Sequence, residues 1–79
     1  MQEKIRKFIV ESFLAGVDDP EFKNEDSFLE TRIIDSIGVL ELVQFIEETW
    51  GIRVEDADLT PENFDSVELA ASYVQMKLR

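Results

Sequence analysis

Residues 35–51 have the sequence DSIGVLELVQFIEETWG, and this stretch decides the expected fold. Its apolar residues recur every three or four positions, which is the period of an amphipathic α-helix. They are Ile37, Leu40, Val43, Ile46 and Trp50, and the stripe is broadened by Val39, Leu42 and Phe45. Asp35 and Ser36 are both residue types that cap helix starts, and Gly51 is typical of a helix end. The pattern predicts a largely buried helix between these caps.

Two more amphipathic stretches flank this helix. The first extends from Gln2 to Leu14, where Ile5, Phe8, Ile9 and Phe13 recur at helical spacing. The second lies near the C-terminus and begins with Asp65 and Glu68, whose spacing is that of a capping box. Its apolar positions, also at helical spacing, are Val67, Ala70, Ala71, Val74 and Leu78. Both stretches are predicted to be helices.

The segments between these helices carry turn signals. From Gly16 to Ile34 no periodic pattern persists, and Asp18-Asp19-Pro20 indicates a turn, so a long ordered loop is expected. Its large apolar side chains predict that it folds over the core: Phe22, Phe28, Leu29, Ile33 and Ile34. Further along, Pro61 follows Thr60 at a position suited to a first helical residue, which predicts a short third helix.

No segment alternates apolar and polar residues for long enough to form a sheet. The expected fold class is therefore all-α, with three main helices and one short helix in a small bundle. A length of 79 residues suits one domain, which we expect to span residues 1–79.

The charge of the chain is strongly negative, with 8 basic and 18 acidic residues and a formal net charge of -10. Such a chain lacks the cations that replace counterions on a phosphate backbone, so nucleic acid is not an expected partner. The same negative field attracts proteins with basic patches and speeds the encounter. We expect transient protein partners.

The chain has no cysteine and no histidine. Disulfides and thiolate metal sites are thereby excluded, and the commonest general base is missing, so we expect no catalytic residue and no metal site. No apolar stretch approaches the length of a membrane span, and the N-terminus lacks the apolar centre of a signal peptide. We expect a cytoplasmic monomer that does not act at a membrane.

The Ser36 hydroxyl lies between the long loop and a helix start, and two interpretations fit it. Serine at such a position is commonly just an N-cap. Alternatively, the positive end of the helix would stabilise a phosphate group attached to the hydroxyl. The residues alone leave both open.

The run from Asp35 to Val43, continuing through 45–48 and 50–52, resembles the attachment site and recognition helix of acyl carrier proteins. Residues 26–30 and 59–67, the length and the acidity are also similar to stand-alone bacterial members of that family. The resemblance implies that a phosphopantetheinyl transferase attaches 4'-phosphopantetheine from coenzyme A to Ser36. Asp35 matches the acidic residue that precedes the modified serine. The arm would supply the missing thiol and hold cargo as a thioester, while partner enzymes perform the chemistry.

The resemblance also implies a docking surface on the same helix. Glu41, Glu47 and Glu48 match positions that meet basic patches of partner enzymes, and with Gln44 they are expected along one exposed strip. Ile37 and Val39 would add apolar contact beside Ser36.

Several features depart from the pattern of fatty-acid carriers and leave the choice of partner open. Gly38 and Arg53 occupy positions where acid is common, and Gln44 occupies one where an apolar residue is frequent. Phe45 and Trp50 either narrow a cavity between the helices or pack in the core, and packing is the commoner role.

The leading hypothesis is a carrier in fatty-acid, lipid or specialised-metabolite synthesis, loaded by a ligase or by an acyl transferase and serving downstream synthases. An aminoacyl or peptidyl carrier would share Ser36 and the fold. A hypothesis from another class is an acidic helical adaptor, in which Ser36 is only a cap and Glu41, Glu47 and Glu48 bind one basic protein.

Overall fold

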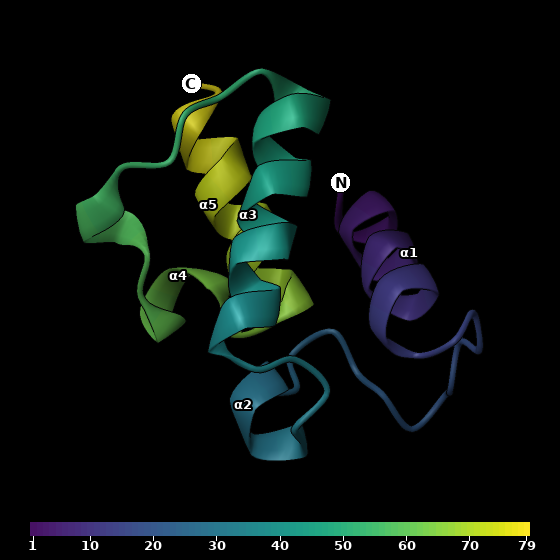
Figure 1. Cartoon of the computed structure of the whole chain (residues 1–79). Helices are drawn as coiled ribbons and strands as arrows, with labels where there is room; N and C mark the ends of the chain where they lie inside the picture. The colour runs from purple at the N-terminus through teal and green to yellow at the C-terminus, as the bar shows by residue number, and fades with distance from the viewer.

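The computed structural model describes residues 1–79 and contains helices but no strands (Figure 1). The main helices are α1 (Gln2–Phe13), α3 (Ser36–Trp50) and α5 (Val67–Lys77). Two helices of four residues, α2 (Phe28–Thr31) and α4 (Pro61–Phe64), and one 3₁₀ turn (Asp56–Asp58) complete the chain. The predicted all-α class with three main helices is confirmed.

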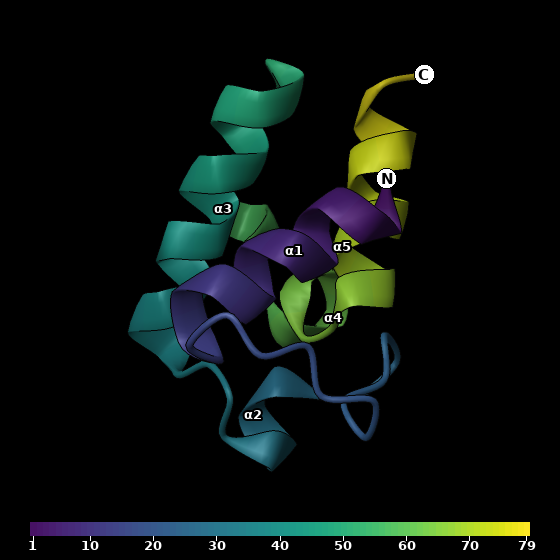
Figure 2. The same ribbon diagram turned by 90° about the vertical axis from the view of Figure 1, so that its right-hand side faces the viewer.

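The helix α1 packs against the two other main helices. It contacts both α3 and α5, and Figure 2 shows it crossing in front of them. The short helix α4 packs against α5, whereas α2 lies at one end of the bundle, below the start of α3 in Figure 1. The N-terminal half of α3 is therefore bordered by α2 and by the segment that leads to α4.

One hydrophobic core holds these elements together. The main helices contribute Ile5, Ile9, Leu42, Val43, Ile46, Val67, Ala70, Ala71, Tyr73 and Val74. The remaining core residues come from α2, α4 and the connections: Phe22, Phe28, Ile34, Val54 and Phe64. Burying a large apolar side chain stabilises the fold by about 1.5–3 kcal/mol, so residues outside the long helices supply a considerable part of the stability.

The connection from residue 14 to residue 35 folds over the core as predicted. Of the five side chains expected to cover the core, Phe22, Phe28 and Ile34 are buried, Ile33 is half-buried and Leu29 is largely exposed. The expectation that this whole segment is a loop was wrong, because it contains α2. Four residues are too few to show a helical period, and this helix is held by the burial of Phe28 and by the Ser27 hydroxyl, which accepts a hydrogen bond from the Glu30 amide.

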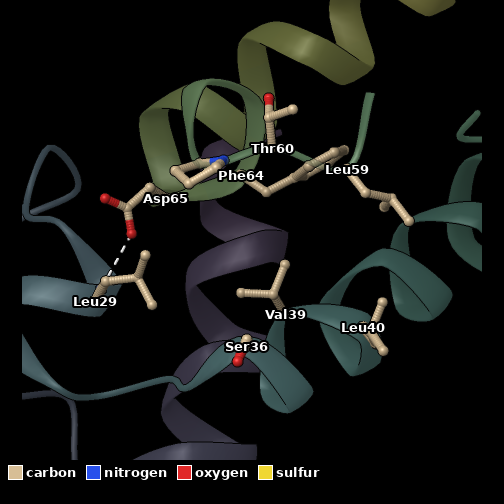
Figure 3. A pocket seen from close by; sticks show the side chains of 9 residues that line it. Leu29, Ser36, Val39, Leu40, Leu59, Thr60, Phe64 and Asp65 are labelled. Carbon is tan, nitrogen blue, oxygen red and sulfur yellow. Dashed lines mark hydrogen bonds between the residues drawn. The ribbon is translucent and has the colours of Figure 1, made fainter. Parts of the chain in front are cut away.

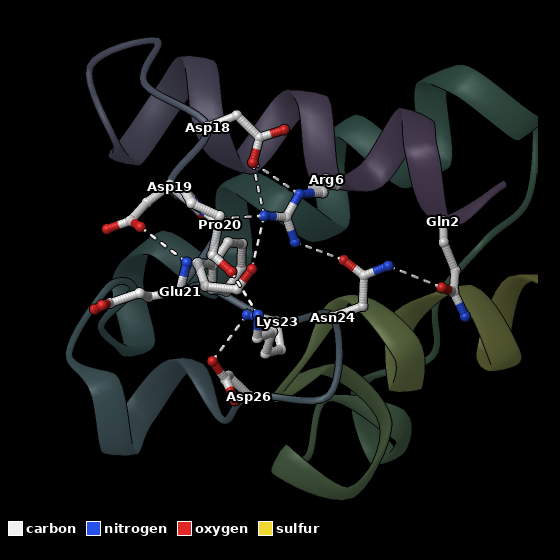
Figure 4. Close-up of polar contacts among 10 residues, drawn as sticks. Gln2, Arg6, Asp18, Asp19, Pro20, Glu21, Lys23, Asn24 and Asp26 are labelled. Carbon is white, nitrogen blue, oxygen red and sulfur yellow. Dashed lines mark hydrogen bonds and ion pairs between the residues drawn. The ribbon is translucent and has the colours of Figure 1, made fainter.

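Arg6 of α1 ties down the first half of the same connection (Figure 4). Its Nη2 donates to Asp18 Oδ1 at 2.6 Å and to the Phe22 carbonyl at 2.7 Å, and its Nη1 donates to Asn24 Oδ1 at 2.8 Å. The guanidinium also lies 4.7 Å from the centre of the Phe22 ring, within the range of a cation–π contact. The Asn24 amide donates in turn to Gln2. One side chain therefore joins several points of the connection to α1.

The start of α5 differs from the predicted capping box. Ser66, not Asp65, is the N-cap, and its hydroxyl accepts a hydrogen bond from the Leu69 amide. The Asp65 carboxylate instead accepts hydrogen bonds from the Ser27 hydroxyl and from the Leu29 amide. Leu78 was expected in the apolar stripe but is half-exposed, because α5 ends at Lys77.

Phe45 and Trp50 pack against other aromatic rings. The Phe45 ring stacks on Phe8 with centroids 4.3 Å apart, and Trp50 meets Phe45 edge to face at 6.0 Å. The Phe8–Phe45 contact joins α1 to α3, and both contacts support the packing interpretation of Phe45 and Trp50. No helix in the chain has both the length and the apolar character needed to cross a bilayer.

Candidate functional site

The start of α3 is set by Asp35 rather than by Ser36. Asp35 has an extended backbone, and its Oδ1 accepts a hydrogen bond from the Gly38 amide at 2.7 Å, as an N-cap does. Ser36 is the first helical residue; it is exposed, and its hydroxyl makes no hydrogen bond to the rest of the chain. The interpretation of Ser36 as a helix cap is therefore wrong.

Gly38 is the point where α3 meets two other segments. A Cβ atom added there would lie 2.6 Å from Ile34 Cγ2 and 3.0 Å from the Phe13 ring. A side chain therefore has no room at this position. The close approach of Ile34 and Phe13 is a physical reason for glycine at this position.

The apolar stripe predicted for α3 is only partly buried. Leu42, Val43 and Ile46 are in the core as expected. Ile37 is 71% exposed and Leu40 is 54% exposed, so the expectation that they belong to the buried stripe was wrong. They lie in the first two turns of α3 but on a different face from Gly38, which meets Phe13 of α1, and they leave apolar surface beside Ser36.

A small apolar hollow of about 140 Å³ opens next to Ser36. Figure 3 shows Val39 pointing into it, with Leu29 and Asp65 on one side and Leu59 and Thr60 across from them. Ser36, Leu40, Pro61 and Phe64 complete the lining. Phe64 is almost fully buried, so it belongs to the floor.

One wall of the hollow is positioned by Asp65. Its Oδ1 accepts from the Leu29 amide at 3.0 Å, its Oδ2 accepts from the Ser27 hydroxyl, and its carbonyl accepts from the Phe28 amide at 2.8 Å. Because Asp65 follows α4 directly, these bonds hold α2 against α4 and place Leu29 at the rim.

The opposite wall belongs to the connection from residue 51 to residue 60. Tyr73 donates its hydroxyl to Asp58 Oδ2 at 2.7 Å, and the Asn63 side chain donates to the Asp58 carbonyl at 2.9 Å. Burial of the phenol, together with its bond to the Asp58 carboxylate, raises the pKa of Tyr73 to about 12. Asp58 therefore fixes the position of Leu59 and Thr60, which follow it.

The expected acidic strip on α3 separates into two parts. Glu41, Gln44 and Glu48 are exposed, and the Gln44 amide donates to Glu48 Oε1 at 3.2 Å. Glu47 is half-buried, and its Oε2 accepts a hydrogen bond from the Val54 amide at 2.9 Å. Glu47 therefore has a structural contact that the sequence pattern did not indicate.

Sequence reasoning missed most of the hollow. Its unforeseen lining residues are Leu29, Leu40, Leu59, Thr60, Pro61, Phe64 and Asp65. They come from three stretches of the chain, at residue 29, at residue 40 and between residues 59 and 65, so no single local spacing marks them. The only indication in the sequence was the number of large apolar side chains in the first connection, which suggested that Leu29 lies near the bundle.

The structure thus brings together Ser36, an apolar hollow and an acidic helix face. No protein-family model matches this chain, so the likeness to acyl carrier proteins rests on the quoted residues.

Proposed function

We propose that this chain is a cytoplasmic carrier protein that bears 4'-phosphopantetheine on Ser36 and delivers acyl groups to partner enzymes. The observation that carries the proposal is the Ser36 hydroxyl, which is exposed and unbonded at the start of a long helix. A residue kept for structure would have used its hydroxyl to cap α3, and Asp35 already does so.

The modification is a phosphoryl transfer from coenzyme A. The Ser36 oxygen attacks the phosphorus that carries the pantetheine group, and a new phosphodiester bond to serine forms. The pyrophosphate P–O bond breaks, and adenosine 3',5'-bisphosphate leaves with the bonding electrons. The serine proton passes to a base at the active site of the transferase.

The electrostatics of the helix start favour the product. The amides of Ser36 and Ile37 have no acceptor in the chain, and the positive end of a 15-residue helix faces the same place. Asp35 adds a negative charge nearby, but its Oδ1 is engaged with the Gly38 amide. A phosphate on Ser36 therefore meets free N–H donors.

The surface around Ser36 suits enzymes with basic patches. Glu41, Gln44 and Glu48 form an exposed polar strip on α3, and the exposed side chains of Ile37 and Leu40 provide apolar contact beside it. Such a surface combines long-range attraction with a small apolar centre. Its partners are the phosphopantetheinyl transferase, the enzyme that loads the acyl group and the downstream synthases.

Intact mass measurement tests the attachment directly. After incubation with coenzyme A and a broad-specificity phosphopantetheinyl transferase, the native chain should gain the mass of one phosphopantetheine group. Ser36→Ala should gain nothing, whereas Ser72→Ala, which removes an exposed serine from α5, should be modified like the native chain. An unmodified native chain would refute the carrier proposal and leave the acidic helical adaptor, with Asp35 in place of Ser36 as the helix cap.

Charge reversal tests the docking surface. Glu41→Lys should slow modification by the transferase at low salt, and the difference should shrink at high salt as the charges are screened. Glu68→Lys makes the same charge change on α5 and should have a smaller effect. Equal rates for both variants would mean that α3 does not dock the enzyme.

A further inference from the structure

The acidic strip that the resemblance implies for α3 is reduced in the folded chain. Gly38 stands where acid is common, and the side chains packed around it leave no space for a Cβ atom. Glu47 is half-buried, and its Oε2 accepts a hydrogen bond from the Val54 amide. Glu41 and Glu48 are therefore the two carboxylates of the strip that are fully exposed on α3.

Two exposed arginines flank the same helix. Arg32 is the C-cap of α2, which lies below the start of α3 in Figure 1. Arg53 comes two residues after Gly51, the C-cap of α3. Neither arginine forms an ion pair, although the chain has 18 acidic residues, whereas Arg6 is paired with Asp18. A free positive charge therefore lies beyond each end of α3.

The backbone of Arg32 is unusual for a residue that has a side chain. Its φ of 60° and ψ of 22° lie in the left-handed region, which glycine adopts readily and which often follows a helix. Glycine would suit this turn better than arginine. The strained backbone therefore indicates that the guanidinium itself has a function.

We propose that Arg32 and Arg53 are specificity-determining residues that exclude enzymes whose basic surface extends past the ends of α3. The resemblance implies that fatty-acid carriers have acid where Arg53 stands, so an enzyme that fits those carriers presents a positive charge there. Like charges that meet across an interface slow the encounter and weaken binding. The enzymes that fit this chain have a narrow basic patch, confined to the part of α3 that bears Glu41 and Glu48.

This inference rests on the proposed function, because the excluded enzymes act on an arm attached to Ser36. The two arginines should contribute separately. The 15 residues of α3 make it about 22 Å long, whereas in about 0.1 M salt the Debye length is about 10 Å. The effects of changing each arginine should therefore multiply.

The probe is a malonyl transferase of bacterial fatty-acid synthesis, because its usual carriers have acid in place of Arg53. Each chain is first converted to the form that bears phosphopantetheine. Malonyl transfer from malonyl-coenzyme A is then followed by intact mass in about 0.1 M salt. Arg32→Glu and Arg53→Glu should each raise kcat/KM by about two- to fivefold, the size of one exposed charge interaction. The double variant should gain about the product of the two, and in about 1 M salt the gains should disappear.

Three further variants separate local charge from net charge. Arg32→Gln and Arg53→Gln remove a positive charge without adding a negative one, so they should give smaller gains of the same sign. Lys77→Glu is the matched control, because it reverses the charge of an exposed residue on α5, and it should give little gain.

Variants at Arg32 and Arg53 that are no faster than the native chain, including no transfer to any of them, overturn the inference. A gain as large for Lys77→Glu also overturns it, because net charge alone would then explain the rates. A native chain that gains no mass from coenzyme A refutes the proposed function itself, so the two failures are distinguished.

Discussion

Two connections border α3, and they are held in place by different forces. The connection from residue 14 to residue 35 has three buried anchors, Phe22, Phe28 and Ile34, and is joined to α1 through Arg6. The connection from residue 51 to residue 60 has one buried anchor, Val54, and depends on hydrogen bonds. Each supplies one wall of the hollow beside Ser36.

The difference shows that length does not decide how firmly a connection is held. The longer connection is stabilised mainly by apolar burial, which is insensitive to pH and tolerates loss of a single polar contact. The shorter one is stabilised by a few polar contacts, so it responds to single-atom changes and to deprotonation. We expect the wall formed by Leu59 and Thr60 to be the more easily displaced.

The largest effect should come from removing an apolar anchor of the longer connection. Phe28→Ala deletes a fully buried ring and should lower the free energy of unfolding by about 3–5 kcal/mol, measured by urea denaturation. Leu29→Ala, at the neighbouring 44% exposed position, should have a much smaller effect. Similar losses for both variants would mean that burial does not anchor this connection.

Gly38 tests the junction between the longer connection and α3. In an exposed helix an alanine is more favourable than glycine by about 1 kcal/mol, but here the added methyl group would overlap Ile34. Gly38→Ala should therefore destabilise the fold by about 1–3 kcal/mol. Adding Ile34→Leu, which removes the overlapping Cγ2 methyl group, should restore part of that loss. A stabilised Gly38→Ala variant would contradict the close packing.

Tyr73→Phe tests the shorter connection, because it removes the bond to Asp58 and keeps the ring. We expect a loss of about 1 kcal/mol in the free energy of unfolding. Amide hydrogen exchange should accelerate at Leu59 and Thr60, while the amides of Phe22 and Phe28 keep their rates. Uniform acceleration across both connections would show that the two are not held independently.

Alkaline pH should act on the shorter connection. The pKa of Tyr73 is raised to about 12 by burial and by Asp58, so the unfolded chain loses this proton first, near the ordinary value of 10.0. The stability contribution is complete below pH 10.0 and decreases as pH rises toward 12. Ultraviolet absorbance reports this directly, since the chain has one tyrosine. A phenol that titrates near 10 in the folded chain would contradict the buried contact.

Acidic pH should act weakly on the longer connection. The hydrogen bond from Arg6 lowers the pKa of the Asp18 carboxyl below its ordinary value of 3.8. The contribution of this pair is therefore present above pH 3.8 and is lost as pH falls through the lowered pKa. Asp18 is largely exposed, so the effect is small and screened by salt. The variant Asp18→Asn should lack this part of the loss of stability in acid. Unfolding curves of the native chain and of the variant, measured near neutral and at acidic pH, test this.

The sequence predicted the long helices better than the short ones. The periods of α1, α3 and α5 predicted all three helices, with ends within a residue or two of the observed ones. The four residues of α2 gave no period, and Asp65 was assigned to a cap that Ser66 forms. Asp35 and Ser36 were both expected as possible caps of α3, and only the structure shows that Asp35 has the extended backbone of the N-cap.

The sequence by itself determined the all-helical class, the acidic charge and the absence of histidine and cysteine, because composition and local periodicity are properties of neighbouring residues. Only the tertiary structure decided that Glu47 accepts a hydrogen bond from the Val54 amide and that Ile37 and Leu40 are exposed. It also decided that Leu29, Leu59 and Phe64 enclose a hollow beside Ser36. These features depend on contacts between residues far apart in the chain, which only the packing of α1, α2 and α4 around α3 and α5 brings together.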